Sequence, residues 1–397
     1  MNNTIRKKVC VIMPFRLLSD SRSIKTIKVL NQYCLVDVYY FDYEESDNDF
    51  FNENTKLFGL QKPKGLKNFI FRHTLFYNEF NYFAKEVLKR KEKYDYVWAH
   101  DLPVLRPALK LKKIIGSKVV YDCHELYIET LNQFFPENSR GIKKLLLDLS
   151  LKFMVKFGSI AERRMIKRVD TCVTVGNKVK DYIERTLPIT GVLVIYNWPY
   201  LQTTNEKVDL RKLLALNQND KILLYQGVMN QGRGLIEMIQ AQKHTNSNIK
   251  FVLMGDGPMK SELQKLVIDL NLQDKIIFID RVNPTVLLQY TRGADAGIVL
   301  QDVNKNMSKK LGIANKFFEY MHAGIPFVAT DAPENRIVFD KFELCTLVDP
   351  KHDINEIADA INDLFENNLE IYKRNAFEAS KVYNWDKQED IIKSIVN

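Results

Sequence analysis

Short runs of apolar residues alternate along the chain with segments in which apolar residues recur every three or four positions. The short runs predict buried strands, and the longer segments predict amphipathic helices. In the first half we expect strands at 8–14, 35–42, 94–101, 118–126 and 171–176, and helices at 23–34, 78–93, 107–117 and 177–187. In the second half we expect strands at 221–229, 249–257, 276–282, 294–301 and 326–330, and helices at 234–244, 259–271, 284–293, 315–323 and 352–367.

Strands that alternate with helices in this way are typical of parallel sheets covered on both faces. The chain has 397 residues, which is too long for one ordinary core, and the alternation breaks near 187–205. We therefore expect an α/β fold with two Rossmann-like, doubly wound parallel-sheet domains that face a central cleft. The expected bounds are 1–195 and 196–375, and 376–397 is expected to be a helix that crosses back to the first domain.

Three glycine-bearing loops follow strands of the second half and precede its helices. They are "QGVMNQGRG" (226–234), "MGDGP" (254–258) and "SKKLGIANK" (308–316). A helix N-terminus favours a negative charge, so these loops suit an anionic ligand. None of them is a GxGxxG or GxxxxGK[ST] motif, which argues against ordinary dinucleotide and Walker loops.

The segment "ANKFFEYMHAGIPFVATD" (314–331) places one carboxylate, Glu319, in an otherwise apolar helix. Asn315 is the expected helix cap, and Gly324 followed by Pro326 is expected to end the helix. Glu319 comes one position too late for a capping box with Asn315. A solvated pair of Lys316 and Glu319 is the structural alternative to a functional role.

The three motifs and their intervals resemble the donor domain of a GT-B glycosyltransferase of the family 4 type, a type that includes bacterial surface-polysaccharide, lipopolysaccharide and capsule enzymes. The resemblance covers 220–350 strongly and most of the remainder loosely. It implies that Arg233 and Lys316 neutralise the diphosphate of a nucleotide sugar, and that Glu319 accepts hydrogen bonds from the ribose hydroxyls. The other positions that it implies for the nucleotide sugar are Gly227, Gly255, Asp256, Val282 and Asn315.

Two positions depart from the family pattern. Leu311 stands where most members carry a second Glu, which commonly contacts the hydroxyls of the sugar. Val228 stands where a basic residue usually follows the first glycine. The diphosphate must therefore rely more on Arg233 and Lys316.

In the first half, "VVYDCHELY" (119–127) resembles the family strand that ends in a histidine over the donor sugar. The resemblance gives this role to His124, which would hold a sugar hydroxyl and orient the anomeric carbon. His100 in "WAHDLP" is a rival, and either histidine could instead be structural. The first loop, "FRLLSDSRS", lacks the usual glycine pair. Asp20, Arg22, His100 and Glu125 are the candidate residues for contact with the acceptor.

Composition and charge refine this picture. Residues 1–190 contain 34 Lys and Arg against 22 Asp and Glu, whereas the remainder contains 24 against 27. The basic half suits an anionic partner, such as membrane lipid or a phosphorylated lipid carrier. No RNA-binding signature is present, so nucleic acid is not expected. The five cysteines are scattered, which suits a reducing, cytoplasmic setting, and no run approaches the roughly 20 apolar residues of a spanning helix.

The stretch 140–168 places Ile142, Leu146, Leu149, Phe153, Phe157 and Ile160 at helical spacing with basic residues around them. Leu147, Leu151 and Met154 are expected to widen this apolar stripe. The pattern fits a helix that lies on a membrane surface. It fits equally a core helix of the first domain with a solvated basic face.

Taken together, the sequence predicts a hexosyl- or N-acetylhexosaminyl-transferase of polysaccharide biosynthesis. We expect a UDP-linked sugar to move to a hydroxyl of a lipid-linked or surface glycan acceptor, with retention of configuration, at the inner face of the cytoplasmic membrane. Neither a cofactor nor a metal is expected, since "DND" (47–49) lies in an acidic stretch interpreted as a solvated loop. A non-catalytic nucleotide- or glycan-binding relative and a GT-B-like sugar-nucleotide epimerase remain alternatives.

Overall fold

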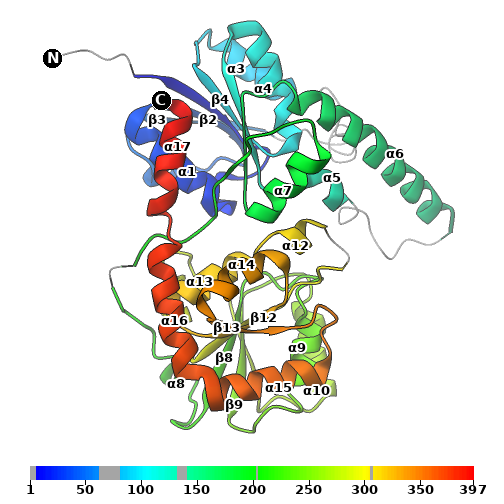
Figure 1. Cartoon of the computed structure of the whole chain (residues 1–397), viewed down its shortest axis with the longest axis vertical. Helices are drawn as coiled ribbons and strands as arrows, with labels where there is room; N and C mark the ends of the chain where they lie inside the picture. Colours follow the sequence, from blue (N-terminus) through cyan, green and yellow to red (C-terminus); the bar gives the residue numbers. More distant parts are fainter. Residues whose placement is uncertain (1–5, 62–80, 132–140, 203, 305–306) are drawn as a thin grey trace. The chain divides into compact units, whose positions relative to one another are not determined.

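The computed structural model describes residues 6–61, 81–131, 141–202, 204–304 and 307–397. The chain divides into two compact units (Figure 1). The N-terminal unit comprises Met1–Asn197 together with Gln388–Asn397, and the C-terminal unit is Trp198–Lys387. The division falls inside the segment where the alternation of strands and helices breaks. Of the segment 376–397, only its last ten residues belong to the N-terminal unit.

The N-terminal unit contains a seven-stranded sheet with the order β3-β2-β1-β4-β5-β6-β7 and parallel pairing throughout. The strands are β1 (Lys8–Ile12), β2 (Leu35–Phe41), β3 (Thr55–Leu60), β4 (Tyr96–His100), β5 (Lys118–Cys123), β6 (Thr171–Thr174) and β7 (Leu193–Val194). The chain runs outward from β1 in one direction and then from β4 in the other. The order therefore reverses between β1 and β4, where a doubly wound sheet places its ligand site.

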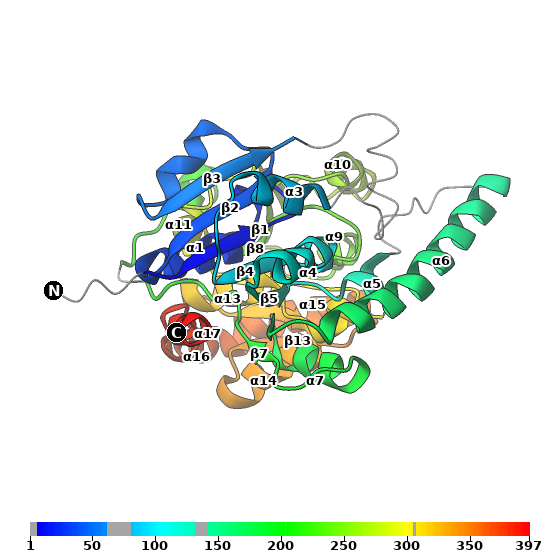
Figure 2. The same cartoon turned by 90° about the horizontal axis from the view of Figure 1, so that it is seen from above.

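Helices cover both faces of this sheet. They are α1 (Ser21–Tyr33), α3 (Asn81–Lys89), α4 (Leu102–Ile115), α5 (Tyr127–Thr130), α6 (Gly141–Ile166), α7 (Asn177–Thr186) and α17 (Asp386–Val396), with short 3-10 helices η1 (Leu17–Ser19) and η2 (Glu45–Phe50). In Figures 1 and 2, α1 and α17 lie on one side of the sheet, and α4 and α6 lie on the other. Within this doubly wound sheet, β1, β4 and β5 are almost completely buried, as their apolar sequences predict.

The acidic stretch after β2 is solvent-exposed, as its composition predicts, except at Asp47. It forms η2, in which Asp47 is fully buried and accepts hydrogen bonds from the Tyr40 hydroxyl at 2.6 Å and the Glu44 amide at 3.0 Å. The Glu44 side chain in turn caps the Asp47 amide. This reciprocal capping holds the carboxylate inside the N-terminal unit, so the "DND" segment has a structural explanation.

The C-terminal unit repeats the design with a six-stranded parallel sheet of order β10-β9-β8-β11-β12-β13. The strands are β8 (Lys221–Gln226), β9 (Ile249–Met254), β10 (Ile276–Ile279), β11 (Ala296–Val299), β12 (Phe327–Thr330) and β13 (Cys345–Val348). Here the order reverses between β8 and β11, so the loops after β8 and its neighbours lie at the expected ligand end of the sheet.

The helices of this unit are α8 (Leu210–Leu213), α9 (Leu235–Ala241), α10 (Lys260–Asp269), α11 (Leu287–Thr291), α12 (Met307–Leu311), α13 (Asn315–Ala323), α14 (Pro333–Phe342), α15 (Ile354–Asp363) and α16 (Leu369–Val382), with the π-helical η4 (Leu364–Asn368). Helix α9 packs against α10 and α15 on one side of the sheet, while α13 packs against α11 and α16 on the other. Both α/β units thus match the predicted doubly wound fold.

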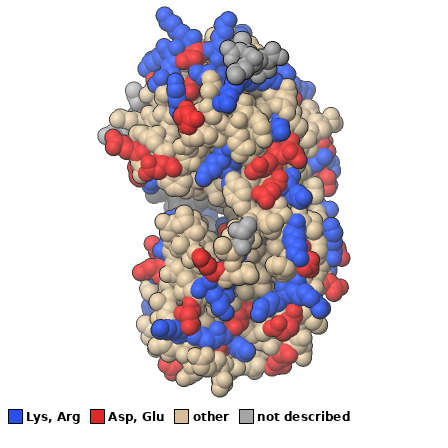
Figure 3. Space-filling view, turned by 90° about the vertical axis from the view of Figure 1, so that its left-hand side faces the viewer, with Lys and Arg blue, Asp and Glu red and all other residues tan. Residues whose placement is uncertain are grey.

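The surface charge differs between the units. On the face in Figure 3, Lys and Arg side chains gather over the upper end of the N-terminal unit, whereas both signs mix over the C-terminal unit. The five cysteines are all buried and unpaired with one another. Among the described residues, no helix has the length and apolar character to cross a bilayer.

Candidate functional site

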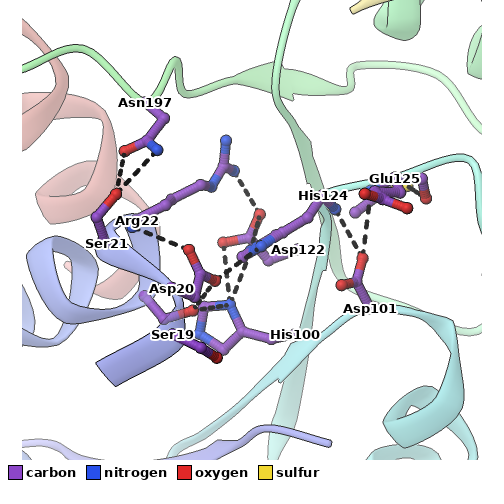
Figure 4. A network of polar contacts seen from close by, with 12 residues as sticks. Ser19, Asp20, Ser21, Arg22, His100, Asp101, Asp122, His124, Glu125 and Asn197 are labelled. Atoms are coloured by element: carbon purple, nitrogen blue, oxygen red, sulfur yellow. Dashed lines mark hydrogen bonds and ion pairs between the residues drawn. The ribbon is translucent and has the colours of Figure 1, made fainter. Parts of the chain in front are cut away.

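Polar side chains converge at the carboxyl ends of β1, β4 and β5 and form the N-terminal cluster (Figure 4). Asp20 follows β1 through η1, His100 ends β4, and His124 comes directly after β5. His100 and Asp122 are register partners on adjacent strands, which fixes their side chains near one another. The cluster therefore lies at the point where the strand order reverses, as the sequence positions of these residues predict.

His124 is the centre of this N-terminal cluster. Its Nδ1 atom lies 3.0 Å from Asp20 Oδ2, and its Nε2 atom lies 2.9 Å from His100 Nδ1 and 3.5 Å from Asp122 Oδ1. The side chains of Asp20 and His124 are 18% and 12% exposed, whereas His100 and Asp122 are completely buried. Asp20 and His124 are therefore the members that a substrate can reach, and the other two support them.

The electrostatic surroundings of His124 and His100 give the two imidazoles different pKa values. Burial opposes a charge on His124, but Asp20, Asp122 and Asp101 together raise its pKa well above the ordinary value. Burial lowers the pKa of His100 to about 3, despite the neighbouring Asp122. Burial would raise the pKa of Asp20, yet the positive His124 holds that pKa well below its usual range. The geometry thus favours an imidazolium at His124 that donates to a neutral His100 and to an ionised Asp20.

Arg22 is a structural member of the N-terminal cluster. It is 2% exposed, and its guanidinium pairs with Asp122 and donates to the carbonyl of Ile195. A buried ion pair of this kind is costly to break because the remaining charge would be left uncompensated. The structure therefore places Arg22 behind the exposed residues rather than at a surface open to an acceptor.

Asp101 is a cluster residue whose role the sequence does not reveal. Its Oδ1 atom accepts hydrogen bonds from the backbone amides of His124 at 2.8 Å and Glu125 at 3.3 Å, and this fixes the turn after β5. The Glu125 side chain itself is exposed. Asp101 adopts φ +67°, a conformation that costs energy for a non-glycine residue and is frequent at functional sites. Burial raises its pKa to about 6.

Two cations lie together at the carboxyl end of β8 and form the C-terminal cluster. Burial and the adjacent Arg233 guanidinium lower the pKa of Lys316 to about 7, against the opposing effect of Glu319. The Lys316 ammonium lies 4.8 Å from the centre of the Tyr225 ring. Among the described residues, neither cation forms an ion pair with a carboxylate. An anion placed here would relieve this unbalanced positive charge.

Glycines allow the loops to approach these cations closely. Gly227 adopts φ +114°, and a Cβ atom there would lie 3.0 Å from Nζ and Cε of Lys316. At Gly255, which has φ +148°, a Cβ atom would lie 2.1 Å from the Gly227 carbonyl oxygen. No other residue fits between the two loops. Asp256 follows them at an exposed position, where its backbone carbonyl accepts from the amide of Met229 at 2.8 Å.

Glu319 projects from the half-buried side of α13, while Phe317, Phe318 and Tyr320 pack into the core. Its Oε2 atom accepts a hydrogen bond from Nε2 of the buried Gln226 at 2.5 Å. The hydroxyl of Thr291 donates to Oε1 of Gln226 at 2.7 Å. Gln226, which Thr291 holds in turn, therefore orients the carboxylate, and among the described residues no ion pair joins Glu319 to Lys316. Gln226 and Thr291 carry no motif by which the sequence would reveal this contact.

Helix α13 begins at Asn315, one residue earlier than expected, because Asn315 was expected to be the cap that precedes the first helical residue. Ala314 occupies the N-cap position without a side-chain hydrogen bond, and Asn315 is the first helical residue, with an exposed side chain. The prediction that Asn315 caps the helix is wrong, and its amide group is left facing solvent. Gly324 ends the helix in the left-handed conformation, as predicted. Val282 lies beyond β10 and is half-buried.

Asp20, His100 and His124 each offer a ligand atom within 4.8 Å of the others, so metal binding at this position needs consideration. A metal requires an unprotonated imidazole. The carboxylates of Asp20 and Asp122 raise the pKa of His124 and favour a proton there. In the structure the three side chains form a charged hydrogen-bond network with His124 at its centre.

Comparison with known proteins shows which family models the chain matches. Residues 206–381 match the model of "Glycosyl transferases group 1", and residues 34–198 match that of "Glycosyltransferase Family 4". An uncharacterized glycosyltransferase of Methanocaldococcus jannaschii is 23% identical over 60% of this chain and 58% of its own length. An N-acetylgalactosamine-N,N'-diacetylbacillosaminyl-diphospho-undecaprenol 4-alpha-N-acetylgalactosaminyltransferase of Campylobacter jejuni is 25% identical over 45% of this chain and 50% of its own length. The chain thus spans about half the length of these curated relatives.

Solved structures with the same fold extend over the whole chain. A sucrose-phosphate synthase of Thermosynechococcus elongatus superposes with a TM-score of 0.78 at 16% identity, covering 98% of both chains. The Anabaena protein HepE in complex with UDP and glucose superposes with a TM-score of 0.75 at 15% identity, covering 98% of this chain and 99% of its own. At such identities the likeness shows the fold alone. With the two adjoining family matches, it shows that the chain belongs to the GT-B glycosyltransferases of the family 4 type.

Proposed function

We propose that the protein transfers a hexose or N-acetylhexosamine from a UDP-linked donor to a hydroxyl of a lipid-linked or surface glycan acceptor, with retention of configuration and without a metal. The observation that carries the proposal is that Lys316 and Arg233 lie together without an ion pair to a carboxylate among the described residues, close to Glu319, which Gln226 holds. HepE and its UDP complexes support the choice of base.

Breaking the glycosidic bond leaves negative charge on the departing diphosphate. Cations fixed before the reaction stabilise this charge more in the transition state than in the ground state. Arg233 offers a planar fork for two phosphate oxygens, and Lys316 offers a point charge that recovers its proton when an anion binds. Glu319, already oriented by Gln226, accepts hydrogen bonds from the ribose diol.

The N-terminal cluster supplies the sugar contacts in this mechanism. The imidazolium of His124 donates hydrogen bonds from both ring nitrogens, and a sugar hydroxyl that replaces one present partner is held in a fixed direction. Asp20, whose half-buried carboxylate lies 3.0 Å from His124 Nδ1, accepts a hydrogen bond from that hydroxyl. His100, Asp122, Arg22 and Asp101 keep the two in place.

Two relatives support a lipid-linked acceptor. The Campylobacter relative is named for a diphospho-undecaprenol acceptor, and an alpha-monoglucosyldiacylglycerol synthase of Streptococcus pneumoniae is 26% identical over 41% of this chain. Such acceptors reside in membranes. The proposal therefore includes a location at the inner face of the cytoplasmic membrane and a place in polysaccharide or glycolipid synthesis.

The test is a panel of nucleotide sugars, first by thermal shift and then by product analysis with a short lipid-linked acceptor. Transfer that needs both substrates and survives excess EDTA supports the proposal. Tight binding without turnover would make the protein a non-catalytic relative, and conversion of the donor alone would make it an epimerase. Loss of transfer with EDTA, restored by Mn²⁺, would contradict the metal-independent mechanism and point to Asp20, His100 and His124.

A further inference from the structure

Helix α6 exposes the apolar stripe that its sequence contains. Leu146 is 62% exposed, Phe153 is 58% and Phe157 is 44%. The large apolar side chains exposed along this stripe are Leu145, Leu146, Leu149, Phe153, Phe157 and Ile160, while Val155 is exposed on another side of the helix. Isolated exposed apolar residues are ordinary on protein surfaces, but a contiguous stripe marks an interaction site. The alternative prediction of a core helix is therefore wrong for these side chains.

The other side of α6 is firmly attached to the N-terminal unit. Met154 and Ile166 are 5% and 1% exposed, and the helix packs against α4 and α5. Leu147 and Leu151 are half-buried, so they belong to the attached side and do not widen the exposed stripe. Figures 1 and 2 show the first turns of α6 extending away from the rest of this unit. The side chains of Ile142 and Lys143 lie outside the described residues.

A groove of about 850 Å³ separates the stripe from α4. Its apolar lining comes from Leu109, Phe153, Phe157, Ile160 and Met165. Its charged lining comes from Arg106, Lys110, Lys113, Arg164 and Arg168. Every charged residue that lines the groove, among the described residues, is thus a cation. On the far side of the stripe, Lys152, Lys156 and Arg163 are exposed. The apolar stripe is therefore bordered by positive charge on both sides.

We propose that this α4–α6 surface docks on a bilayer that contains anionic lipids, with the stripe among the upper acyl chains and lipid phosphates over the groove. The 26 residues of α6 span about 39 Å, which suits a flat surface. Helices that lie in a membrane interface combine an apolar stripe with flanking Lys and Arg in this manner. A second copy of the chain would instead bring cations against cations. The benefit to catalysis, access to a lipid-linked acceptor, rests on the proposed function, but the docking itself does not.

The experiment is co-sedimentation of the full chain with vesicles of phosphatidylcholine alone or with 30% phosphatidylglycerol, a composition chosen to give an anionic surface of about −30 mV. The wild type should bind only the anionic vesicles, and binding should weaken as salt shortens the screening length to about 8 Å at physiological ionic strength. Each Lys near such a surface strengthens partitioning roughly fivefold. Lys110→Gln/Lys113→Gln should therefore weaken binding about 30-fold, and Lys152→Gln/Lys156→Gln should do the same.

Phe153→Ser/Phe157→Ser should abolish binding even at low salt, because the remaining charges hold the protein only at the surface. The matched control is Lys373→Gln/Lys381→Gln, which removes two exposed lysines from α16 and should bind like the wild type. Wild type that ignores anionic vesicles at low salt would overturn the proposal. So would equal binding by all variants, or a wild-type dimer that Phe153→Ser/Phe157→Ser converts to a monomer without any vesicle binding.

UDP affinity should be the same in all these variants, since none of them touches the C-terminal cluster. Vesicle binding together with failure of every donor to turn over would leave the docking surface standing and reject the proposed function. Turnover on a short soluble acceptor without vesicle binding would support the proposed function and reject the docking surface.

Discussion

The side-chain amide of Gln226 donates a 2.5 Å hydrogen bond to the carboxylate of Glu319, across the gap between the end of β8 and the helix α13. Gln226 is buried and is itself fixed by the Thr291 hydroxyl. The carboxylate therefore keeps one oriented oxygen without any ligand. A diol that binds there meets an acceptor already in position, which reduces the entropy lost on binding.

Glu319→Ala should weaken UDP binding by about 1–3 kcal/mol, because the ribose hydroxyls lose a charged acceptor. Gln226→Leu should weaken it less, and Thr291→Val least, because these residues only orient Glu319. Calorimetry with free UDP measures the series. Unchanged affinity in a folded Glu319→Ala protein would remove Glu319 from the nucleotide site.

Arg233→Ala should lower kcat more than it raises KM, because the charge on the leaving diphosphate peaks in the transition state. Loss of one such contact costs on the order of 100-fold in rate. Steady-state kinetics with donor in excess measures both constants, with Arg374→Ala on the exposed side of α16 as the control. Normal kcat with raised KM would show that Arg233 binds ground state and transition state equally.

Nucleotide affinity should fall as the pH rises through about 7, the pKa to which burial and Arg233 lower Lys316. Above that pH, Lys316 is a neutral amine in the ligand-free protein. UDP binding is then coupled to the uptake of a proton by Lys316. Calorimetry at pH 8 in buffers of different ionisation enthalpy should report proton uptake. Lys316→Met should abolish the uptake, whereas Lys310→Met, at an exposed position of α12, should not.

The same pKa has a consequence for the stability of the ligand-free protein. A Lys pKa that is lower in the folded than in the unfolded state makes the free energy of unfolding rise between about pH 7 and 10.5. Lys316→Met should therefore raise the Tm below pH 7 and have no such effect above pH 10.5. A lower Tm at pH 6 would mean that Lys316 stabilises the empty site.

Asp20→Asn should lower the pKa of His124, because it removes the carboxylate that most favours the imidazolium. NMR titration of the imidazole measures this, with exposed Asp49→Asn as the control. A histidine whose folded pKa is raised stabilises the protein below its unfolded value of 6.5, and the stabilisation is lost as pH rises through the folded pKa. The wild type should lose this contribution only at higher pH than the variant. An unchanged titration would mean that Asp122 and Asp101 raise the pKa of His124 without help from Asp20.

The doubly wound fold was predictable because its central strands, such as β1 and β8, are uninterrupted apolar runs. Edge strands carry a weaker pattern. Strand β3 contains Thr55, Lys56 and Gly59 and is only partly buried, and β13 contains Thr346 and is only half-buried at its two central residues, so neither was predicted. Asp47 was assigned to a solvated loop because nothing in the sequence distinguishes it from its acidic neighbours. Only the structure shows that its carboxylate caps a turn and accepts a hydrogen bond from Tyr40.

The candidate site was predictable where local spacing carries the information. The glycines and Arg233 lie in loops of recognisable length, Lys316 and Glu319 lie in the first turns of the helix that follows such a loop, and the strand-end positions of His100 and His124 bring these two histidines together. Contacts between residues far apart in the sequence leave no such signal. Arg22 and Asp122 pair across 100 positions, and Gln226 and Glu319 across 93, which only the folded chain reveals.

The division of the chain into units has a consequence for biosynthesis. Lys7, beside the first strand, donates to the backbone carbonyls of Val396 and Asn397 at 2.8 and 2.6 Å, so α17 completes the N-terminal unit. The ribosome synthesises the residues of α17 only after it has synthesised the whole C-terminal unit. The N-terminal unit therefore remains incomplete until the C-terminal unit has been synthesised, and the apolar surface that Ile392 and Val396 of α17 cover stays exposed during that interval.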